Sequence, residues 1–126
     1  MFTKIVISLF LTLSLSANDM FYKDDIKANK AYEMQQKGAI IIDVRTVAEF
    51  KNLRAKNSIN IPIFYEKNGK RVFNINFMHQ VLLEIKNYNK EIVLICRSGS
   101  RTKFAANILA QEGFTKVYNI KYGLRV

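Results

Sequence analysis

The sequence predicts an α/β fold in which a central parallel sheet is flanked by helices. Two continuous apolar runs rich in β-branched residues, 39–44 and 91–96, are typical of strands that are buried on both faces. Segments with helical periodicity alternate with these and other short apolar runs, which indicates crossover connections between parallel strands. A chain of 126 residues has room for one domain of this kind.

Local signals define the individual elements. Asp24 or Asp25 can cap a first helix that ends at Gly38, and Thr46 with Glu49 forms a capping box for a short second helix. In chain order we expect a helix from 24 or 25 to about 37, a strand at 39–44, a helix at 46–53, a strand at 58–62, a hairpin across 64–73, a helix at 77–86, a strand at 91–96, a helix at 102–112 and a strand at 117–120.

Two further patterns refine these expectations. The Asn68-Gly69 pair lies between apolar runs, which is a strong signal for a β-hairpin. The helical period predicts the buried faces of the first and last helices. These faces are Ala28, Ala31 and Tyr32 in the first helix, and Phe104, Ala105, Ile108 and Leu109 in the last.

Charge and residue counts exclude several classes of site. Twenty Lys and Arg against ten Asp and Glu give a net charge of +10, which attracts anions. The basic residues are scattered rather than gathered in one stripe, which argues against nucleic acid as a partner. One cysteine excludes an internal disulfide and a cysteine-based zinc cluster, and one histidine, His79, excludes a multi-histidine metal site. We therefore expect neither a metal nor a cofactor.

Residues 1–17 have the layout of a secretory signal peptide. Lys4 provides a positive start, an apolar run covers 5–15, and Ser16-Ala17 offers a cleavage point. The run is too short to span a bilayer comfortably, so we expect no stable membrane insertion after cleavage. The expected mature domain, 18–126, is exported, and is periplasmic if the source is a Gram-negative bacterium. An unpaired cysteine in an exported protein is either inert and buried or functional.

The loop that follows the strand at 91–96 holds the candidate chemistry. A thiol at the carboxyl end of a parallel strand lies at the edge where such sheets bind ligands. Backbone amides of the loop, the positive end of the following helix and two arginines all favour the thiolate. The simpler alternative is an inert buried thiol beside a basic surface loop. The candidate residues are Cys96, Arg97, Ser98, Gly99, Ser100, Arg101 and Thr102.

Four segments together resemble the rhodanese-like domain family. They are Ile41-Ile42-Asp43-Val44-Arg45 with Glu49-Phe50, then Ile59-Asn60-Ile61-Pro62, then Ile92 through Thr102, then Ala105-Ala106 with Leu109 and Gly113-Phe114. The resemblance implies a rhodanese-like fold and a sulfurtransferase. In such an enzyme Cys96 takes sulfane sulfur from an anionic donor such as thiosulfate and carries it as a persulfide to a thiol or other acceptor. It also implies that residues 97–102 surround the sulfur, and we expect Asp43 and Arg45 to support the loop.

The sequence departs from the family pattern in three places. Lys56-Asn57-Ser58 replaces the Gly-His that often precedes the isoleucine, and the hairpin across 64–73 resembles an insertion. After Gly123 the chain has only Leu124-Arg125-Val126 where the family continues into a helix. We therefore expect one sheet face to be bare, or to be covered by a protein partner.

Two alternative functions remain on the same fold. A cysteine-dependent phosphatase would have five residues between its cysteine and arginine, whereas four separate Cys96 from Arg101. A non-catalytic binding or sulfur-carrier module would use the fold without turnover. His79 falls in the helix at 77–86 and in no motif, so we expect it to have no catalytic role.

Overall fold

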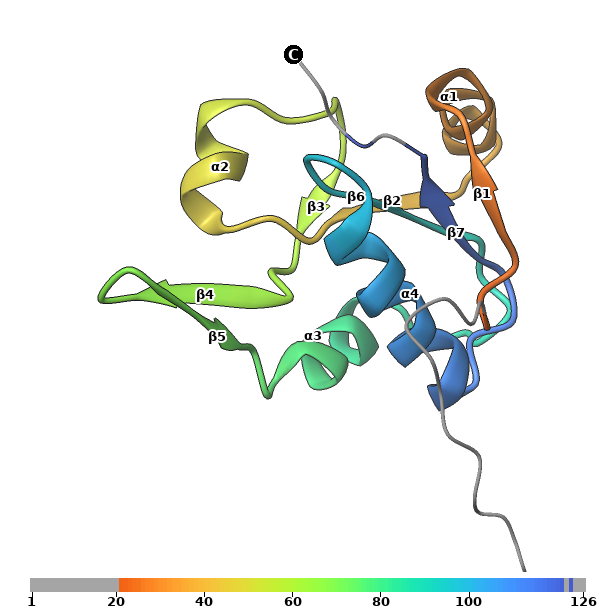
Figure 1. Ribbon diagram of the computed structural model, residues 1–126. Helices are drawn as coiled ribbons and strands as arrows, with labels where there is room; N and C mark the ends of the chain where they lie inside the picture. The colour runs from red at the N-terminus through yellow and green to blue at the C-terminus, as the bar shows by residue number, and fades with distance from the viewer. Residues whose placement is uncertain (1–20, 122, 124–126) are drawn as a thin grey trace, which may run out of the picture.

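The computed structural model describes residues 21–121 and Gly123. Its centre is a five-stranded parallel sheet with the order β1-β7-β6-β2-β3 (Figure 1). The strands are β1 (Asp24–Ile26), β2 (Ile40–Asp43), β3 (Ile59–Asn60), β6 (Ile92–Ile95) and β7 (Val117–Ile120). The predicted α/β class with a central parallel sheet is therefore confirmed. The expected signal peptide at 1–17 lies outside the described residues.

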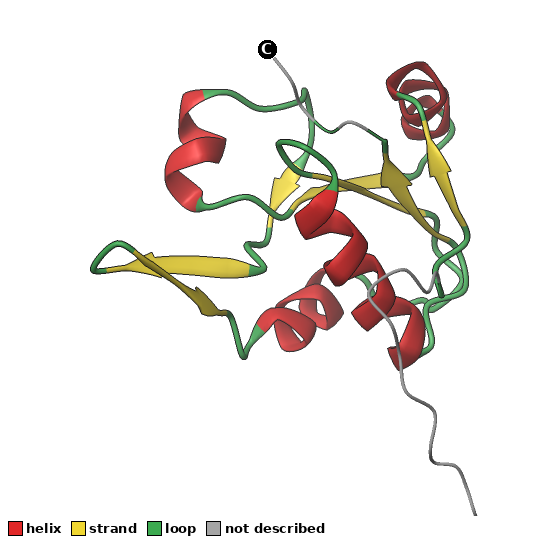
Figure 2. Cartoon of the chain, viewed as in Figure 1, coloured by secondary structure: helices red, strands yellow, loops and turns green. Residues whose placement is uncertain are grey.

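Four helices and a separate hairpin surround this sheet in the described part of the chain. They are α1 (Ala28–Gln36), α2 (Val47–Asn52), α3 (Phe77–Glu84), α4 (Ser100–Glu112) and the antiparallel pair β4 (Phe64–Lys67) and β5 (Lys70–Phe73). Helices α3 and α4 cover one face of the sheet, and α1 lies on the other (Figure 2). No helix in the described ranges is long and apolar enough to cross a bilayer.

Alternation along β6 shows how the sheet forms two cores. Ile92 and Leu94 pack in the cluster under α3 and α4, whereas Val93 and Ile95 pack in the cluster under α1. All four side chains are buried, with Val93 0% exposed, as expected for a strand covered on both sides. The expectation of a bare sheet face was wrong for these residues, because the apolar side chains on the α1 side are also buried.

The start of the first helix was predicted wrongly. Residues 24–26 form β1, which pairs in parallel with Tyr118–Ile120 of β7, and α1 begins only at Ala28. Pairing with a distant strand outweighs the local capping signal of the aspartates. The buried face also differs, since Met34 joins Ala31 in the core while Tyr32 is 63% exposed.

The last helix differs from its prediction at two points. It begins at Ser100, two residues earlier than expected, and Phe104 is 46% exposed rather than turned into the core. The ring of Phe104 stacks on Phe64 at a centroid distance of 5.8 Å and meets Phe73 edge-on at 6.0 Å. The predicted hairpin is confirmed, and its aromatic residues explain why an outward position of α4 is apolar.

Candidate functional site

Cys96 lies where β6 ends and the loop to α4 begins. The residue is 0% exposed, and the backbone N–H of Gly99 donates to its Sγ atom at 2.9 Å. The hydroxyl oxygen Oγ1 of Thr102 lies 3.6 Å from the same sulfur. Gly99 adopts a φ of 101° as the N-cap of α4, a conformation that glycine reaches without strain. The loop therefore wraps around the sulfur and begins the helix directly beside it.

Arg101 faces a carboxylate from another element. Its Nη1 and Nη2 atoms donate to Oε1 and Oε2 of Glu49 at 2.8 and 3.0 Å, which ties the loop to α2. The hydrogen bonds from Arg101, joined by those of Thr46 and opposed by burial, lower the pKa of Glu49 to about 2. The hydrogen bonds that Arg101 donates to Glu49 in turn raise the pKa of the guanidinium, although burial opposes this. Arg101 is thus a buried, charge-compensated anchor of the loop.

Glu49 has two partners at once. Its Oε1 atom also accepts from the backbone N–H of Thr46 at 3.0 Å, and the Thr46 hydroxyl accepts from the N–H of Glu49 at 3.3 Å. The predicted capping box is therefore confirmed. Sequence reasoning assigned Glu49 to the cap alone. Its pairing with Arg101 was missed, because 52 positions separate the two residues.

Asp43 and Arg45 form a second buried pair at the end of β2. The Nε and Nη2 atoms of Arg45 donate to Oδ1 and Oδ2 of Asp43 at 3.0 and 2.7 Å, and Arg45 Nη2 also donates to the carbonyl of Leu53. The side chain of Asn60 donates to the carbonyls of both Asp43 and Arg45 at 3.0 Å. These contacts hold the segment between β2 and α2, and neither side chain reaches Cys96 through a bond of its own.

A chain of polar groups approaches Cys96 from β7 and β1. The hydroxyl of Thr102 donates to Oδ1 of Asn119, and Nδ2 of Asn119 donates to Oδ1 of Asp25 at 2.8 Å. Asn119 is 1% exposed. Sequence reasoning missed both Asn119 and Asp25, because it placed the aspartate at a helix cap and no local pattern joins it to the loop.

Gly123 supports the loop from the other side. A Cβ atom at this position would lie 2.3 Å from the carbonyl oxygen of Cys96 and 2.6 Å from that of Arg97. Its φ of 63° also favours glycine. Only a residue without a side chain fits here, because the backbone of Gly123 packs directly against the cysteine loop.

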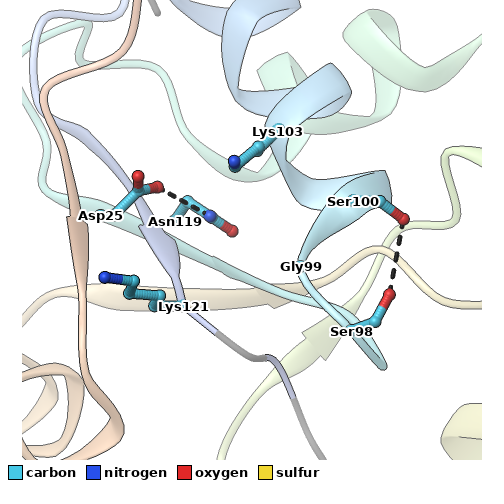
Figure 3. A pocket seen from close by; sticks show the side chains of 7 residues that line it. All are labelled: Asp25, Ser98, Gly99, Ser100, Lys103, Asn119 and Lys121. Carbon is cyan, nitrogen blue, oxygen red and sulfur yellow. Dashed lines mark hydrogen bonds between the residues drawn. The ribbon is translucent and has the colours of Figure 1, made fainter. Parts of the chain in front are cut away.

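The remaining predicted residues lie on the outer side of the loop. Arg97, Ser98 and Ser100 are exposed, and the hydroxyls of the two serines lie 3.5 Å apart. Ser98, Gly99 and Ser100 line a pocket of about 360 Å³, together with Lys103, Lys121, Asp25 and Asn119 (Figure 3). Two ammonium groups and one carboxylate therefore lie beside the loop.

The predicted loop residues thus divide into three sets. Cys96, Gly99 and Thr102 meet around the sulfur, Arg101 turns to α2, and the exposed Ser98 and Ser100 line the pocket. Among the described residues, no group of three or more His, Cys, Asp and Glu side chains could hold a metal ion. The arrangement can stabilise negative charge on sulfur, because an amide N–H and the positive end of α4 are directed at it.

Comparisons with known proteins agree with this geometry. The family model of the rhodanese-like domain matches residues 27–126. Senescence-associated protein DIN1 of Raphanus sativus is 36% identical over 93 residues, 74% of this chain and 50% of that protein. Thiosulfate sulfurtransferase 18 of Arabidopsis thaliana is 32% identical over 100 residues, 78% of this chain and 73% of that protein.

A solved structure extends the likeness to three dimensions. The crystal structure of Rv0390 from M. tuberculosis matches with a TM-score of 0.66 and 27% identity over 82% of this chain and 80% of that one. The chain spans only about half the length of the Raphanus relative. The matched range nevertheless contains the complete cysteine loop and every strand of the sheet except β1. The chain therefore belongs to the rhodanese-like domain family.

Proposed function

We propose that the protein is a sulfurtransferase that moves sulfane sulfur from a donor such as thiosulfate to a thiophilic acceptor through a persulfide on Cys96. The observation that carries the proposal is the 2.9 Å bond from the Gly99 N–H to Sγ at the start of α4. An N–H donor at that distance stabilises the thiolate, which is the nucleophilic form of cysteine. The likeness to a thiosulfate sulfurtransferase supports the same reaction.

The reaction proceeds in two displacements. The Cys96 thiolate attacks the outer sulfur of thiosulfate, so that a new S–S bond forms while the S–S bond of the donor breaks and sulfite leaves with the electron pair. A nucleophile such as a thiolate then attacks the outer sulfur of the persulfide. The second S–S bond breaks, and its electron pair returns to Sγ as the regenerated thiolate. Each step is the thiol–disulfide exchange type of displacement at sulfur.

Charge beside the loop supports an anionic donor. Lys103 and Lys121 line the pocket that borders Ser98 and Ser100, and the whole chain carries a net charge of +10. Such a field raises the local concentration of small anions. Arg101 acts differently from a substrate clamp, because Glu49 already occupies its guanidinium. In this proposal Arg101 holds the loop, and the lysines attract the donor.

The complete burial of Cys96 favours a second candidate. A sulfur that no solvent reaches suits a non-catalytic binding or sulfur-carrier module, in which the fold recognises a partner and turnover is absent. The two candidates differ in one respect that can be measured, namely whether thiosulfate transfers its outer sulfur to Cys96.

The proposal extends to where the protein acts. We expect residues 1–17 to direct export, which places the domain in the periplasm if the source is a Gram-negative bacterium. In that oxidising compartment a buried thiol is protected from adventitious disulfide formation.

Release of sulfite tests the reaction. Protein in excess over thiosulfate is mixed rapidly, and the free sulfite is measured before an acceptor is added. The proposal predicts a burst of about one sulfite for each thiosulfate bound, which separates the chemical step from later turnover. Cys96→Ser is the matched control and gives no burst. Equal sulfite from both proteins, or none from either, would contradict the proposed reaction and favour the non-catalytic module.

A further inference from the structure

The hairpin of β4 and β5 and the neighbouring face of α4 leave a cluster of aromatic side chains exposed. The rings of Phe64, Phe73 and Phe104 contact one another, with centroid distances of 5.8, 6.0 and 6.3 Å. Phe73 is nevertheless 40% exposed, and Phe104 is exposed to a similar extent. Val72 and Ile75, which flank Phe73 along the chain, are exposed as well. A group of exposed apolar side chains of this kind marks an interaction site, whereas single scattered ones do not.

Three cations of the hairpin border this cluster. Lys67, Lys70 and Arg71 are all exposed, and Cζ of Arg71 lies 5.9 Å from the centre of the Phe64 ring. The register places Lys67 directly opposite Lys70, and like charges in such a cross-strand pair destabilise a hairpin. The one acidic residue of the hairpin, Glu66, lies opposite Arg71. The hairpin therefore keeps a local excess of positive charge that an acidic partner would offset.

Helix α4 connects the aromatic cluster to the cysteine loop. Ser100 and Phe104 are four positions apart on this helix, so they share one face and lie about 6 Å apart along its axis. Ser100 is exposed and belongs to the loop that surrounds Cys96. A protein that covers the ring of Phe104 would therefore also extend to the outer side of the cysteine loop.

The distribution of polar and apolar side chains favours a protein over a membrane as the partner. The turn at Asn68-Gly69 is polar and lies between Lys67 and Lys70, whereas the phenylalanines lie at the base of the hairpin beside α4. An apolar face that binds a membrane enters the interface by about 5–10 Å, and here the polar end of the projecting hairpin would meet the membrane first (Figure 1). Protein interfaces instead have an aromatic centre and a charged rim, as this surface has.

We propose that this surface docks an acidic segment of the protein that accepts sulfur from the cysteine loop. The proposal rests on the proposed function, because the partner is the acceptor of that reaction. An apolar side chain of the segment packs against the rings, and its carboxylates face the three cations. Docking then holds the acceptor thiol at a high effective concentration beside the loop. The docking surface consists of Lys67, Lys70, Arg71, Phe73 and Phe104.

Selection from a library of random-sequence peptides tests the docking surface without a named partner. The target is the full chain with Cys96→Ser, so that no sulfur chemistry is involved. We expect the enriched peptides to carry Asp or Glu on both sides of an apolar side chain, and we expect their affinity to fall as salt is added. No enrichment, or enriched peptides without an excess of acidic residues, would overturn the proposal.

Two pairs of matched variants locate the binding. Lys70→Glu turns the lysine pair into a pair of opposite charges, which favours the hairpin, yet the affinity for the enriched peptides should fall at least about threefold. Lys37→Glu makes the same change in net charge at the end of α1, on the other side of the sheet, and should weaken binding less. Phe104→Ala should weaken binding at least about fivefold, whereas Tyr32→Ala on α1 should have no effect. Thermal melts confirm that folded proteins are compared, and equal losses within either pair would contradict the assigned surface.

Two further measurements separate the other outcomes. If the protein sediments with vesicles of phosphatidylglycerol and phosphatidylcholine and Phe104→Ala abolishes this, the surface binds lipid and the proposal is wrong. With the wild-type persulfide, an enriched peptide extended by a cysteine should take up sulfur faster than the same peptide with amides in place of its carboxylates. Equal rates would exclude a role of the surface in sulfur transfer. If no persulfide forms, the proposed function fails, while peptide binding to Cys96→Ser is decided independently.

Discussion

The cysteine loop at residues 96–102 and the hairpin at residues 64–73 are held in opposite ways. The hairpin is held by the antiparallel pairing of β4 with β5 and by the local Asn68-Gly69 turn. Its aromatic residues also contact Phe104 of α4. The loop is held by residues far from it in sequence, namely Glu49, Asn119 and Gly123. Figure 1 shows the hairpin projecting from the body of the domain and the loop between β6 and α4 at the end of the sheet.

The difference shows where the geometry of the site is determined. Glu49 of α2, Asn119 of β7 and Gly123 after β7 meet the loop, so a change at any of these residues should alter the position of Sγ. A change in the hairpin should mainly alter local stability, because no hydrogen bond within the described part of the chain joins residues 64–73 to residues 96–99. Matched substitutions in the two regions therefore separate general effects on the fold from effects on the site.

The largest contrast is expected between two glycines. Gly123→Ala places a Cβ atom against the carbonyls of Cys96 and Arg97 and should destabilise the fold by about 2–5 kcal/mol through strain and overpacking. Gly69→Ala meets no atom within 4 Å and should cost only the left-handed strain of about 1–2 kcal/mol. Denaturant melts and sulfite release measure both. If Gly123→Ala kept wild-type stability and transfer, the proposed support of the loop would be wrong.

Two basic residues give the next contrast. Arg101→Ala removes the two charge-assisted bonds to Glu49 and loosens the loop, at a cost of about 1.5–3 kcal/mol, so turnover should fall at least about tenfold. Lys67→Ala removes an exposed charge of the hairpin and should change turnover less than about twofold. Thiosulfate-dependent turnover measures both. Equal losses would show that overall charge, rather than the anchored loop, controls the reaction.

The lowered pKa of Glu49 leads us to expect a smaller effect, in which the stability of the fold depends on pH. Its pKa falls from an ordinary value of 4.5 to about 2 in the folded protein. A carboxyl with a lowered pKa stabilises the fold fully above the higher value, and that contribution is lost as the pH falls from about 4.5 to about 2. Glu49→Gln should therefore be less stable than the wild type at neutral pH, and the difference should shrink across this window.

An exposed glutamate is the control for that experiment. Glu33 pairs with Lys30 at 3.6 Å on the surface of α1, where an ion pair contributes little. As the pH is lowered, the melting temperature of Glu33→Gln should follow that of the wild type. If the difference in stability between the wild type and Glu49→Gln stayed constant from neutral pH to about pH 2, the Glu49–Arg101 pair would not be its cause.

Local signals determined which parts could be predicted from the sequence. The capping box of Thr46 with Glu49, the turn at Asn68-Gly69 and the apolar run that becomes β6 each involve residues a few positions apart. The position of Cys96 at the end of a strand was also predicted, because the apolar run of the strand ends there and a helical pattern follows the loop. These elements were predicted with nearly correct bounds.

Long-range pairing accounts for what was missed. Residues 24–26 carry a helix-cap signal, but pairing with β7 makes them a strand. Arg101 reaches Glu49 across 52 positions, and Asn119 reaches Asp25 across 94. Residues this far apart follow no helical or strand repeat, so a single sequence does not show that they pair. The position of Cys96 at the end of β6 was therefore predictable, whereas the residues that hold the loop in place required the fold.

The central claim is that Cys96 carries sulfur, and intact-mass spectrometry tests it most directly. The protein is incubated with thiosulfate, desalted and weighed before and after treatment with cyanide. The account predicts a gain of about 32 Da, the mass of one sulfur atom in a persulfide, that cyanide removes and that Cys96→Ser never acquires. An unchanged mass in the folded wild-type protein, or the same gain in Cys96→Ser, would contradict the account.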